Sequence, residues 1–268
     1  MYINKSDSQK VKVGAIIVSR SNSARLKNKA FLKIGNLTSI EHCIKNTQRM
    51  KYLDEVILAT TNLSIDRRYN SYVKKTGAKI FFGDPLNLIE RNYLAAKKYK
   101  LDIIVRITGD CPNISREICE ELLIDHLKKG SDYTVANKFP VGASGEIISF
   151  KALERLYLYI KREKNFKYTE YVGFYFKNNP KLFKYNICKI NPKYQKNFRL
   201  TLDYKEDLKM FNLLHDKLKK LNLDNNLENI IKIIKKYKYI SKTNSHKKLK
   251  YKSNHFIKKI KKITKIKK

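Results

Sequence analysis

Short apolar runs alternate with amphipathic segments through the first half of the chain, and this order limits the fold more than any other feature. Five apolar runs have the length and composition of buried strands: 13–19, 55–61, 78–83, 102–109 and 132–137. Four segments between them have helical periodicity: 37–50, 64–77, 86–100 and 114–130. Continuous apolar runs are typical of parallel strands that are covered on both faces. The alternation therefore predicts an α/β fold with a doubly wound, mostly parallel sheet.

The pattern changes near residue 140. Residues from about 140 to 198 are rich in Tyr and Phe and predict a small α+β insertion. A strand at 199–203 is then expected to return to the main sheet. Two amphipathic helices follow, at 206–220 and 226–237. We therefore expect one domain over residues 11–239 that contains the insertion.

A basic tail covers residues 240–268. The chain has a formal net charge of +35, and 15 of its lysines lie in 235–268, which contains no acidic residue. Near the end, isoleucines recur at every third position with lysines between them: Ile257, Ile260, Ile263 and Ile266. As a helix, this segment would be basic and amphipathic and suited to peripheral contact with an anionic membrane. The alternative is a disordered, lysine-rich extension.

The positive charge also raises nucleic-acid binding as an alternative function. The chain is rich in Lys, Asn, Ile and Tyr and has no Trp, a composition that AT-rich coding DNA would also produce, so charge alone decides little. No RRM, KH or helix-turn-helix signature occurs, and the tail has few aromatic residues for base stacking. We therefore expect no specific nucleic-acid partner.

The cysteines and the apolar runs bear on the location of the protein. The four cysteines form no C-x-x-C pair and no zinc pattern with histidine. No apolar run reaches the roughly 20 residues that span a bilayer, and the N-terminal residues lack the apolar core of a signal peptide. We expect a cytoplasmic protein with reduced thiols.

The loop after the first predicted strand, SRSNSARLKNKAF at 19–31, is strongly basic and contains no glycine. Neither a Walker A loop nor a G-x-G-x-x-G motif occurs in the chain. The side chains of Arg20, Ser23, Arg25 and Lys29 could instead surround a triphosphate at the carboxyl end of the strand. The alternative is a solvated basic loop.

Two aspartates follow other predicted strands. Asp110 lies in RITGDCP at 106–112, where a carboxylate could hold a divalent cation or could merely cap a turn. Asp203 ends the predicted strand at 199–203 and is a candidate second ligand. Asp207 lies in the first turn of the next helix, where a carboxylate is favourable without any further role. Cationic loop residues with two such carboxylates suit nucleotidyl transfer.

Taken together, five segments resemble the cytidylyltransferase family: R-x-x-S-x-R-L-x-x-K at 20–29, EVILATT at 55–61, RITGDCP at 106–112, EYVGFYFKNNP at 170–180 and RLTLDYKEDL at 199–208. The family includes CMP-Kdo and CMP-acylneuraminate synthetases, and the most similar branch is that of spore-coat polysaccharide biosynthesis. The resemblance implies a GT-A-like nucleotidyltransferase fold. It also implies transfer of CMP from CTP to an acidic sugar with Mg²⁺, release of pyrophosphate, and a homodimer.

The resemblance assigns roles to particular residues. It implies that Arg25, Lys29 and Asp110 are catalytic and that Asp110 and Asp203 bind the metal. The implied nucleotide-binding residues are Arg20, Ser23, Arg25, Lys29, Thr60, Thr61 and Arg106. The implied substrate-binding residues of the insertion are Glu146 and Glu170.

Four positions depart from the family pattern. Lys27 and Asn28 stand where relatives usually have Pro and Gly, Ser144 where many have Asp, and Tyr171 where many have His. These differences leave the identity of the sugar open. They also leave a non-catalytic relative as an alternative, beside a protein that binds nucleic acid or a membrane surface.

Overall fold

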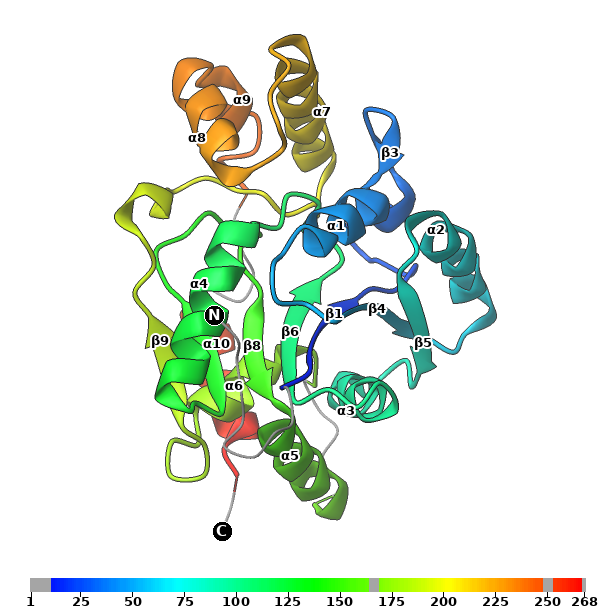
Figure 1. Cartoon of the computed structure of the whole chain (residues 1–268), viewed down its shortest axis with the longest axis vertical. Helices are drawn as coiled ribbons and strands as arrows, with labels where there is room; N and C mark the ends of the chain where they lie inside the picture. Colours follow the sequence, from blue (N-terminus) through cyan, green and yellow to red (C-terminus); the bar gives the residue numbers. More distant parts are fainter. Residues whose placement is uncertain (1–10, 164–168, 248–252, 267–268) are drawn as a thin grey trace.

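A seven-stranded sheet forms the centre of the computed structural model, which describes residues 11–163, 169–247 and 253–266 (Figure 1). Its strand order is β5-β4-β1-β6-β8-β7-β9. The bounds are β1 Val13–Val18, β4 Glu55–Thr61, β5 Lys79–Gly83, β6 Ile103–Thr108, β7 Tyr133–Ala136, β8 Glu146–Ser149 and β9 Tyr185–Cys188. Only β8 among these strands runs antiparallel to its neighbours. The predicted doubly wound, mostly parallel α/β sheet is confirmed.

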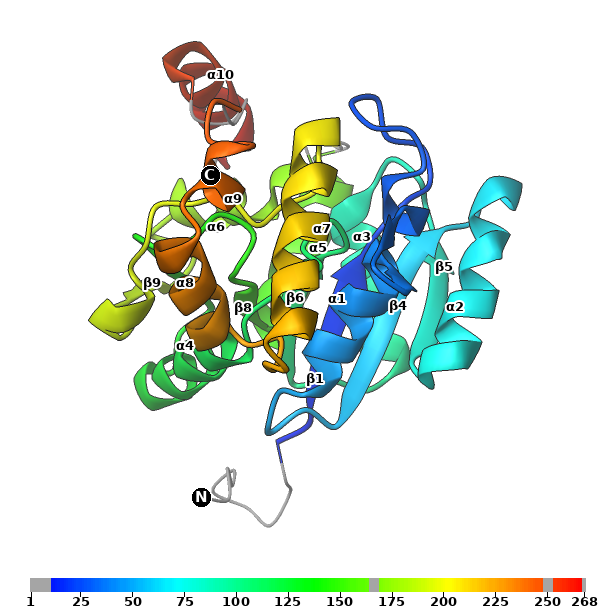
Figure 2. The same ribbon diagram turned by 90° about the horizontal axis from the view of Figure 1, so that it is seen from above.

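Helices cover both faces of the sheet (Figures 1 and 2). One face packs against α1 Ser39–Gln48, α2 Tyr69–Thr76, α4 Arg116–Lys129, α7 Lys205–Lys220 and α8 Leu227–Lys236. The other face packs against α3 Leu88–Lys98, α5 Phe150–Arg162 and α6 Val172–Lys177. A short hairpin of β2 Lys33–Ile34 and β3 Leu37–Thr38 precedes α1. Each face thus has its own apolar core.

The helix boundaries follow local signals in the sequence. Thr38 caps α1, because its side chain accepts a hydrogen bond from the Glu41 backbone N–H while the Glu41 carboxylate accepts one from the Thr38 N–H. The next predicted helix begins as a 3₁₀ turn at Ser64–Arg68 and continues as α2. It ends at Gly77, whose φ of 71° is left-handed.

The expected strand at 199–203 is absent. The segment is extended, but its β-pairing is limited to one isolated bridge, between Arg199 and Val141. Its backbone bonds to loops instead: Leu200 N–H donates to Val141 O at 2.6 Å and Leu202 N–H donates to Asp110 O at 2.8 Å. All five residues of 199–203 are buried, so the segment lies in the interior although it does not pair with the main sheet as predicted.

The insertion is also more closely joined to the sheet than expected. β8 lies between β6 and β7, and β9 forms the edge of the same sheet next to β7. The remaining parts, α5, the 3₁₀ turn Thr169–Tyr171 and α6, lie on the face covered by α3. Residues 140–198 therefore extend the main sheet as well as covering one side of it.

The described part of the basic tail is folded rather than disordered. The helix α9 Tyr239–Lys242 buries Ile240 beside α7 and α8. The helix α10 Asn254–Thr264 packs on α6 and buries Phe256 and Ile260, while Ile257 is exposed. The amphipathic alternative was right about a helix, but part of its apolar side faces the protein. Across the described residues, no helix combines the length and apolar character that a membrane span requires.

Candidate active site

Two aspartates from distant parts of the chain meet at one lysine. Lys29 Nζ donates to Asp110 Oδ2 at 2.5 Å and to Asp203 Oδ1 at 2.8 Å. Arg25 Nη2 donates to the same Asp203 oxygen at 2.5 Å. We call these four residues the charged cluster. The predicted convergence of loop cations with Asp110 and Asp203 is present in the geometry.

The local folds around β1 and β6 position this cluster. Lys29 begins the 3₁₀ turn Lys29–Phe31, and Asn28 before it has a left-handed φ of 55°. Asparagine adopts this conformation more readily than most residues, so it can stand where relatives have glycine. Asp110 follows β6 at the carboxyl edge of the sheet. Its carbonyl accepts from Leu202 N–H, which holds the segment that bears Asp203 against this edge.

The pKa values of Asp203 and Lys29 are shifted in the directions that favour their ionised forms. Burial would raise the pKa of Asp203, but Lys29 and Arg25 outweigh burial and lower that pKa to about 2. Burial likewise opposes the charge of Lys29, and the carboxylates of Asp110 and Asp203 raise its pKa above the usual value. Lys29 and Asp203 therefore stabilise each other's ionised forms.

Arg20 and Ser23 lie in the same loop as the cluster. Arg20 is exposed and Ser23 is half-buried. Within the described residues, neither side chain has a hydrogen-bond partner. Their role in nucleotide binding stays a prediction.

Thr60 and Thr61, at the end of β4, are buried and bind a residue that sequence reasoning missed. The hydroxyl of Thr60 donates to Asp66 Oδ2 at 3.1 Å, and the hydroxyl of Thr61 donates to the same oxygen. The other oxygen, Oδ1, accepts from the Ser21 backbone N–H at 2.8 Å. Asp66 thus ties β4 to the basic loop. A single aspartate in a predicted helix gave no sign of this connection.

Arg106 points toward the insertion and makes no hydrogen bond with the charged cluster. Its Nη1 donates to Glu146 Oε2 at 2.6 Å, in register across β6 and β8, and its Nη2 donates to the Glu170 carbonyl at 3.3 Å. Burial lowers the pKa of Arg106, but Glu146 more than compensates and raises it. The structure therefore groups Arg106 with the two predicted substrate residues rather than with the predicted phosphate ligands.

Arg91 on α3 is a second residue that sequence reasoning missed. It is 3% exposed, and its Nε is buried without a hydrogen-bond partner among the described residues. Burial and the nearby positive charge of Arg20 lower its pKa to about 10. The signal that the sequence offered was the position of Arg91 on the buried side of the predicted helix 86–100.

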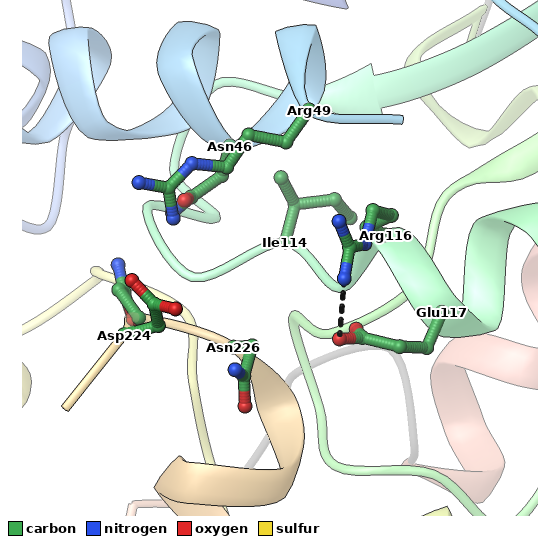
Figure 3. A pocket seen from close by; sticks show the side chains of 8 residues that line it. Asn46, Arg49, Ile114, Arg116, Glu117, Asp224 and Asn226 are labelled. Carbon is green, nitrogen blue, oxygen red and sulfur yellow. Dashed lines mark ion pairs between the residues drawn. The ribbon is translucent and has the colours of Figure 1, made fainter. Parts of the chain in front are cut away.

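A pocket between α1, the start of α4 and the loop before α8 lies apart from the charged cluster (Figure 3). Its lining includes Arg49 and Arg116, but also Glu117 and Asp224, so its charges are mixed. Arg116 and Glu117 form a long ion pair of 3.9 Å. No member of the charged cluster lines this pocket, and we place the candidate active site at the cluster.

The donor set of the cluster fits a divalent cation. Mg²⁺ typically binds one or two carboxylates and completes its shell with water and phosphate oxygens. Asp110 and Asp203 supply two carboxylates that already share one positive group. Over the described stretches of chain, no three or more His, Cys, Asp or Glu side chains form a complete metal site. A cation here would therefore take further ligands from a phosphate substrate and water.

A family model described as "Cytidylyltransferase" matches residues 14–260. The chain belongs to the cytidylyltransferase family. It is 34% identical over 238 residues to the uncharacterized protein MJ1063 of Methanocaldococcus jannaschii, a match that covers 88% of this chain and 96% of that protein. It is 26% identical over 207 residues to the spore coat polysaccharide biosynthesis protein SpsF of Bacillus subtilis, covering 75% of this chain and 85% of SpsF.

A solved structure agrees with this membership. The chain resembles a cytidylyltransferase from Leptospira borgpetersenii with a TM-score of 0.77 and 27% identity, over 89% of this chain and 99% of that one. The family match reaches into α10 and so includes most of the segment expected to be a tail. The predicted family and fold are confirmed, and the roles of individual residues stay predictions.

Proposed function

We propose that this cytidylyltransferase transfers CMP from CTP to a hydroxyl group of an acidic sugar and releases pyrophosphate. The observation that carries the proposal is the bridge from Lys29 to both Asp110 and Asp203, with Arg25 beside it, at the carboxyl edge of the parallel strands. Ligands of doubly wound sheets bind at this edge. The similarity to SpsF supports a role in surface polysaccharide synthesis.

Arg25 and Lys29 bind the triphosphate and offset its negative charge in this proposal. Asp110 and Asp203 hold Mg²⁺, which supplies Lewis-acid stabilisation of the phosphate oxygens when bound. The sugar hydroxyl attacks the α-phosphorus in line, and the bond to pyrophosphate breaks. Positioning and charge stabilisation provide most of the rate enhancement in such reactions. No histidine belongs to the charged cluster, and we assign no protein base.

The acceptor side of the proposal involves the insertion. Glu146 and the Glu170 carbonyl both hold Arg106, which orders this side of the site. Tyr171, the family departure next to Glu170, packs edge-on against Phe256 of α10 at 4.9 Å between ring centroids. We propose that these residues set which sugar is accepted. Family membership supports CTP as the nucleotide.

A pyrophosphate-release assay with four nucleoside triphosphates and a panel of acidic sugars tests the function. We expect release with CTP and one class of sugar. Asp110→Asn should lower kcat/KM at least about 100-fold, since it removes a charged ligand from the site. Asp125→Asn is the matched control, because Asp125 bonds to Lys129 on the surface of α4. Wild-type turnover in Asp110→Asn would contradict the proposal.

The remaining expectations are part of the same proposal: a cytoplasmic location, a homodimer and peripheral membrane contact through the lysines of the tail. Light scattering of the purified protein measures the dimer. Flotation with anionic liposomes measures the membrane contact, and equal flotation of the full-length protein and of a form lacking residues 248–268 would end that idea.

A further inference from the structure

Asp207 is the centre of a buried polar network behind the charged cluster. It lies in the first turn of α7 and is 0% exposed. Its Oδ2 accepts from the backbone N–H groups of Asp203 at 2.9 Å and Tyr204 at 3.0 Å. A carboxylate that only favoured the helix dipole would have no reason to be fully buried. Asp207 instead holds the backbone of Asp203.

Arg199 connects this centre to the side chain of Asp203. Its Nε donates to Asp207 Oδ1 at 2.8 Å, and its Nη2 donates to Asp203 Oδ2 at 3.0 Å. The other oxygen of Asp203, Oδ1, then faces Lys29 and Arg25. The two oxygens of Asp203 are thus divided, one toward the protein interior and one toward the charged cluster.

Asn244 closes the network from the C-terminal region. It is 0% exposed, and its Nδ2 donates to Asp207 Oδ1 at 2.9 Å and to the Arg199 carbonyl at 3.3 Å. It lies just after α9, beyond the expected domain boundary at residue 239. Lys247 adds an ion pair with Glu206 at 2.8 Å, on the same turn of α7. Residues 239–247 are therefore attached directly behind Asp203.

Stability alone is a weak reason for such a network. A buried ion pair typically gains little over apolar packing because both charges lose their hydration. Here Arg199 Nη1 and Asn244 Oδ1 are also buried with no partner among the described residues, which costs further stability. The effect that the geometry does deliver is a fixed orientation of Asp203. Hydrogen bonds behind a metal ligand commonly change metal affinity or activity about 10–100-fold.

We propose that Arg199, Asp207 and Asn244 are positioning residues that orient the carboxylate of Asp203 toward the cation, so that residues 239–247 complete the active site. The proposal rests on the function proposed above. It assigns a role to the C-terminal segment that the charge pattern did not suggest.

The test measures Mn²⁺ binding to the full-length protein in the presence of a non-hydrolysable CTP analogue, by electron paramagnetic resonance. Asn244→Ala and Asp207→Asn should each weaken Mn²⁺ binding about 10-fold and lower kcat. Binding of the nucleotide in the presence of EDTA should stay as in the wild type. Leu218→Ala is the matched control, because it removes a buried side chain of α7 outside the network. It should lower the melting temperature and leave Mn²⁺ affinity unchanged.

Wild-type Mn²⁺ affinity in Asn244→Ala would overturn the proposal, as would an equal loss in Leu218→Ala. If Asp207→Asn does not fold, Asn244→Ala still decides the test, because the Asn244→Ala substitution removes no charge. Failure of the proposed function has a different signature: the wild type would bind Mn²⁺ and nucleotide yet release no pyrophosphate with any sugar. Absence of Mn²⁺ binding by the wild type would overturn both proposals.

Discussion

At the scale of single residues, Lys29 holds together two carboxylates that would otherwise repel each other. The ammonium group of Lys29 places one positive charge between Asp110 and Asp203. Lys29 is mostly buried, so its ion pairs are partly shielded from water. Among the described residues Asp110 pairs with Lys29 alone, whereas Asp203 also pairs with Arg25 and Arg199.

Lys29→Met should therefore destabilise the protein by about 1–3 kcal/mol. Mn²⁺ should raise the melting temperature of this variant more than that of the wild type, because the metal would replace the missing ammonium group. Differential scanning fluorimetry with and without Mn²⁺ measures both effects. Lys27→Met, at an exposed position of the same loop, is the control. An equal response to Mn²⁺ in both variants would mean that the carboxylates do not share a cation.

A pair of neighbouring histidines leads to a second prediction at this scale, about how the stability of the protein depends on pH. His42 of α1 and His215 of α7 meet edge-on, with ring centroids 4.4 Å apart. Burial and the neighbouring His42 lower the pKa of His215 to about 3. The unfolded chain, in which histidine has its ordinary pKa near ~6.5, then binds more protons than the folded protein between about pH 6.5 and pH 3. Stability is therefore lost as the pH falls through this range.

His215→Gln should make the melting temperature less sensitive to pH between 7 and 5. One such group contributes at most about 1.4 kcal/mol per pH unit. Thermal melts at several pH values measure the slope, and the exposed His246 gives a control variant, His246→Gln. Parallel slopes for the wild type and His215→Gln would show that this histidine does not cause the acid sensitivity.

Sequence reasoning succeeded for single residues where position alone was enough. Lys29 and Asp110 follow predicted parallel strands, and the ends of such strands meet at one edge. Asp207 lies in the first turn of α7, as predicted, but that favourable position gave no sign of its contacts with Arg199 and Asn244. Sequence reasoning also missed Asn244, since no local pattern shows that a lysine-rich segment returns to a site formed by residues more than forty positions earlier.

At the scale of elements, periodicity and caps predicted the helices and the parallel strands well. The segment 199–203 was the exception. Leu200 and Leu202 alternate with polar residues as in a strand, but the neighbouring backbone belongs to the loops at Val141 and Asp110. The strand-like sequence indicated an extended segment, but it did not identify the partner of the backbone, and the polar residues of the segment are buried as well as the leucines.

Gly142 permits this close approach, which leads to an element-scale prediction. Its φ is 87°, and a Cβ atom there would lie 2.3 Å from the Leu200 carbonyl oxygen. Gly142→Ala should push the segment that bears Asp203 away from β6, destabilise the protein by more than about 1 kcal/mol and lower kcat. Gly77→Ala has the same backbone strain but no contact within 4 Å. Gly77→Ala should therefore lose stability and keep its specific activity. Thermal melts and turnover measurements compare the two variants, and full activity in Gly142→Ala would contradict the prediction.

At the scale of the whole molecule, the site joins parts that are far apart in the sequence. Arg25 and Asp203 are 178 positions apart. The family pattern predicted their meeting, whereas the fold of the C-terminal region could not be predicted from composition. The lysine-rich composition favoured disorder over a helix, whereas the packing of Phe256 and Ile260 on α6 depends on a surface that only the complete fold provides.

Two truncated forms separate the contributions of this region. A chain ending at Lys247 keeps Asn244 and should retain CTP binding and turnover. It lacks α10, which contacts Tyr171, so its KM for the sugar should rise. A chain ending at Lys238 loses Asn244 and should lose most of its kcat. Steady-state kinetics with varied CTP and varied sugar distinguishes the two, and full turnover by the shorter chain would show that 239–247 is dispensable.

The place of β8 in the sheet has a consequence for how the polypeptide folds. β8 pairs with β6 on one side and β7 on the other, although both precede it along the chain. During synthesis, the position between β6 and β7 in the sheet therefore stays empty until the residues up to Ser149 have left the ribosome. Until then, the edge of β6 that later pairs with β8 is exposed, and it can pair with a wrong strand.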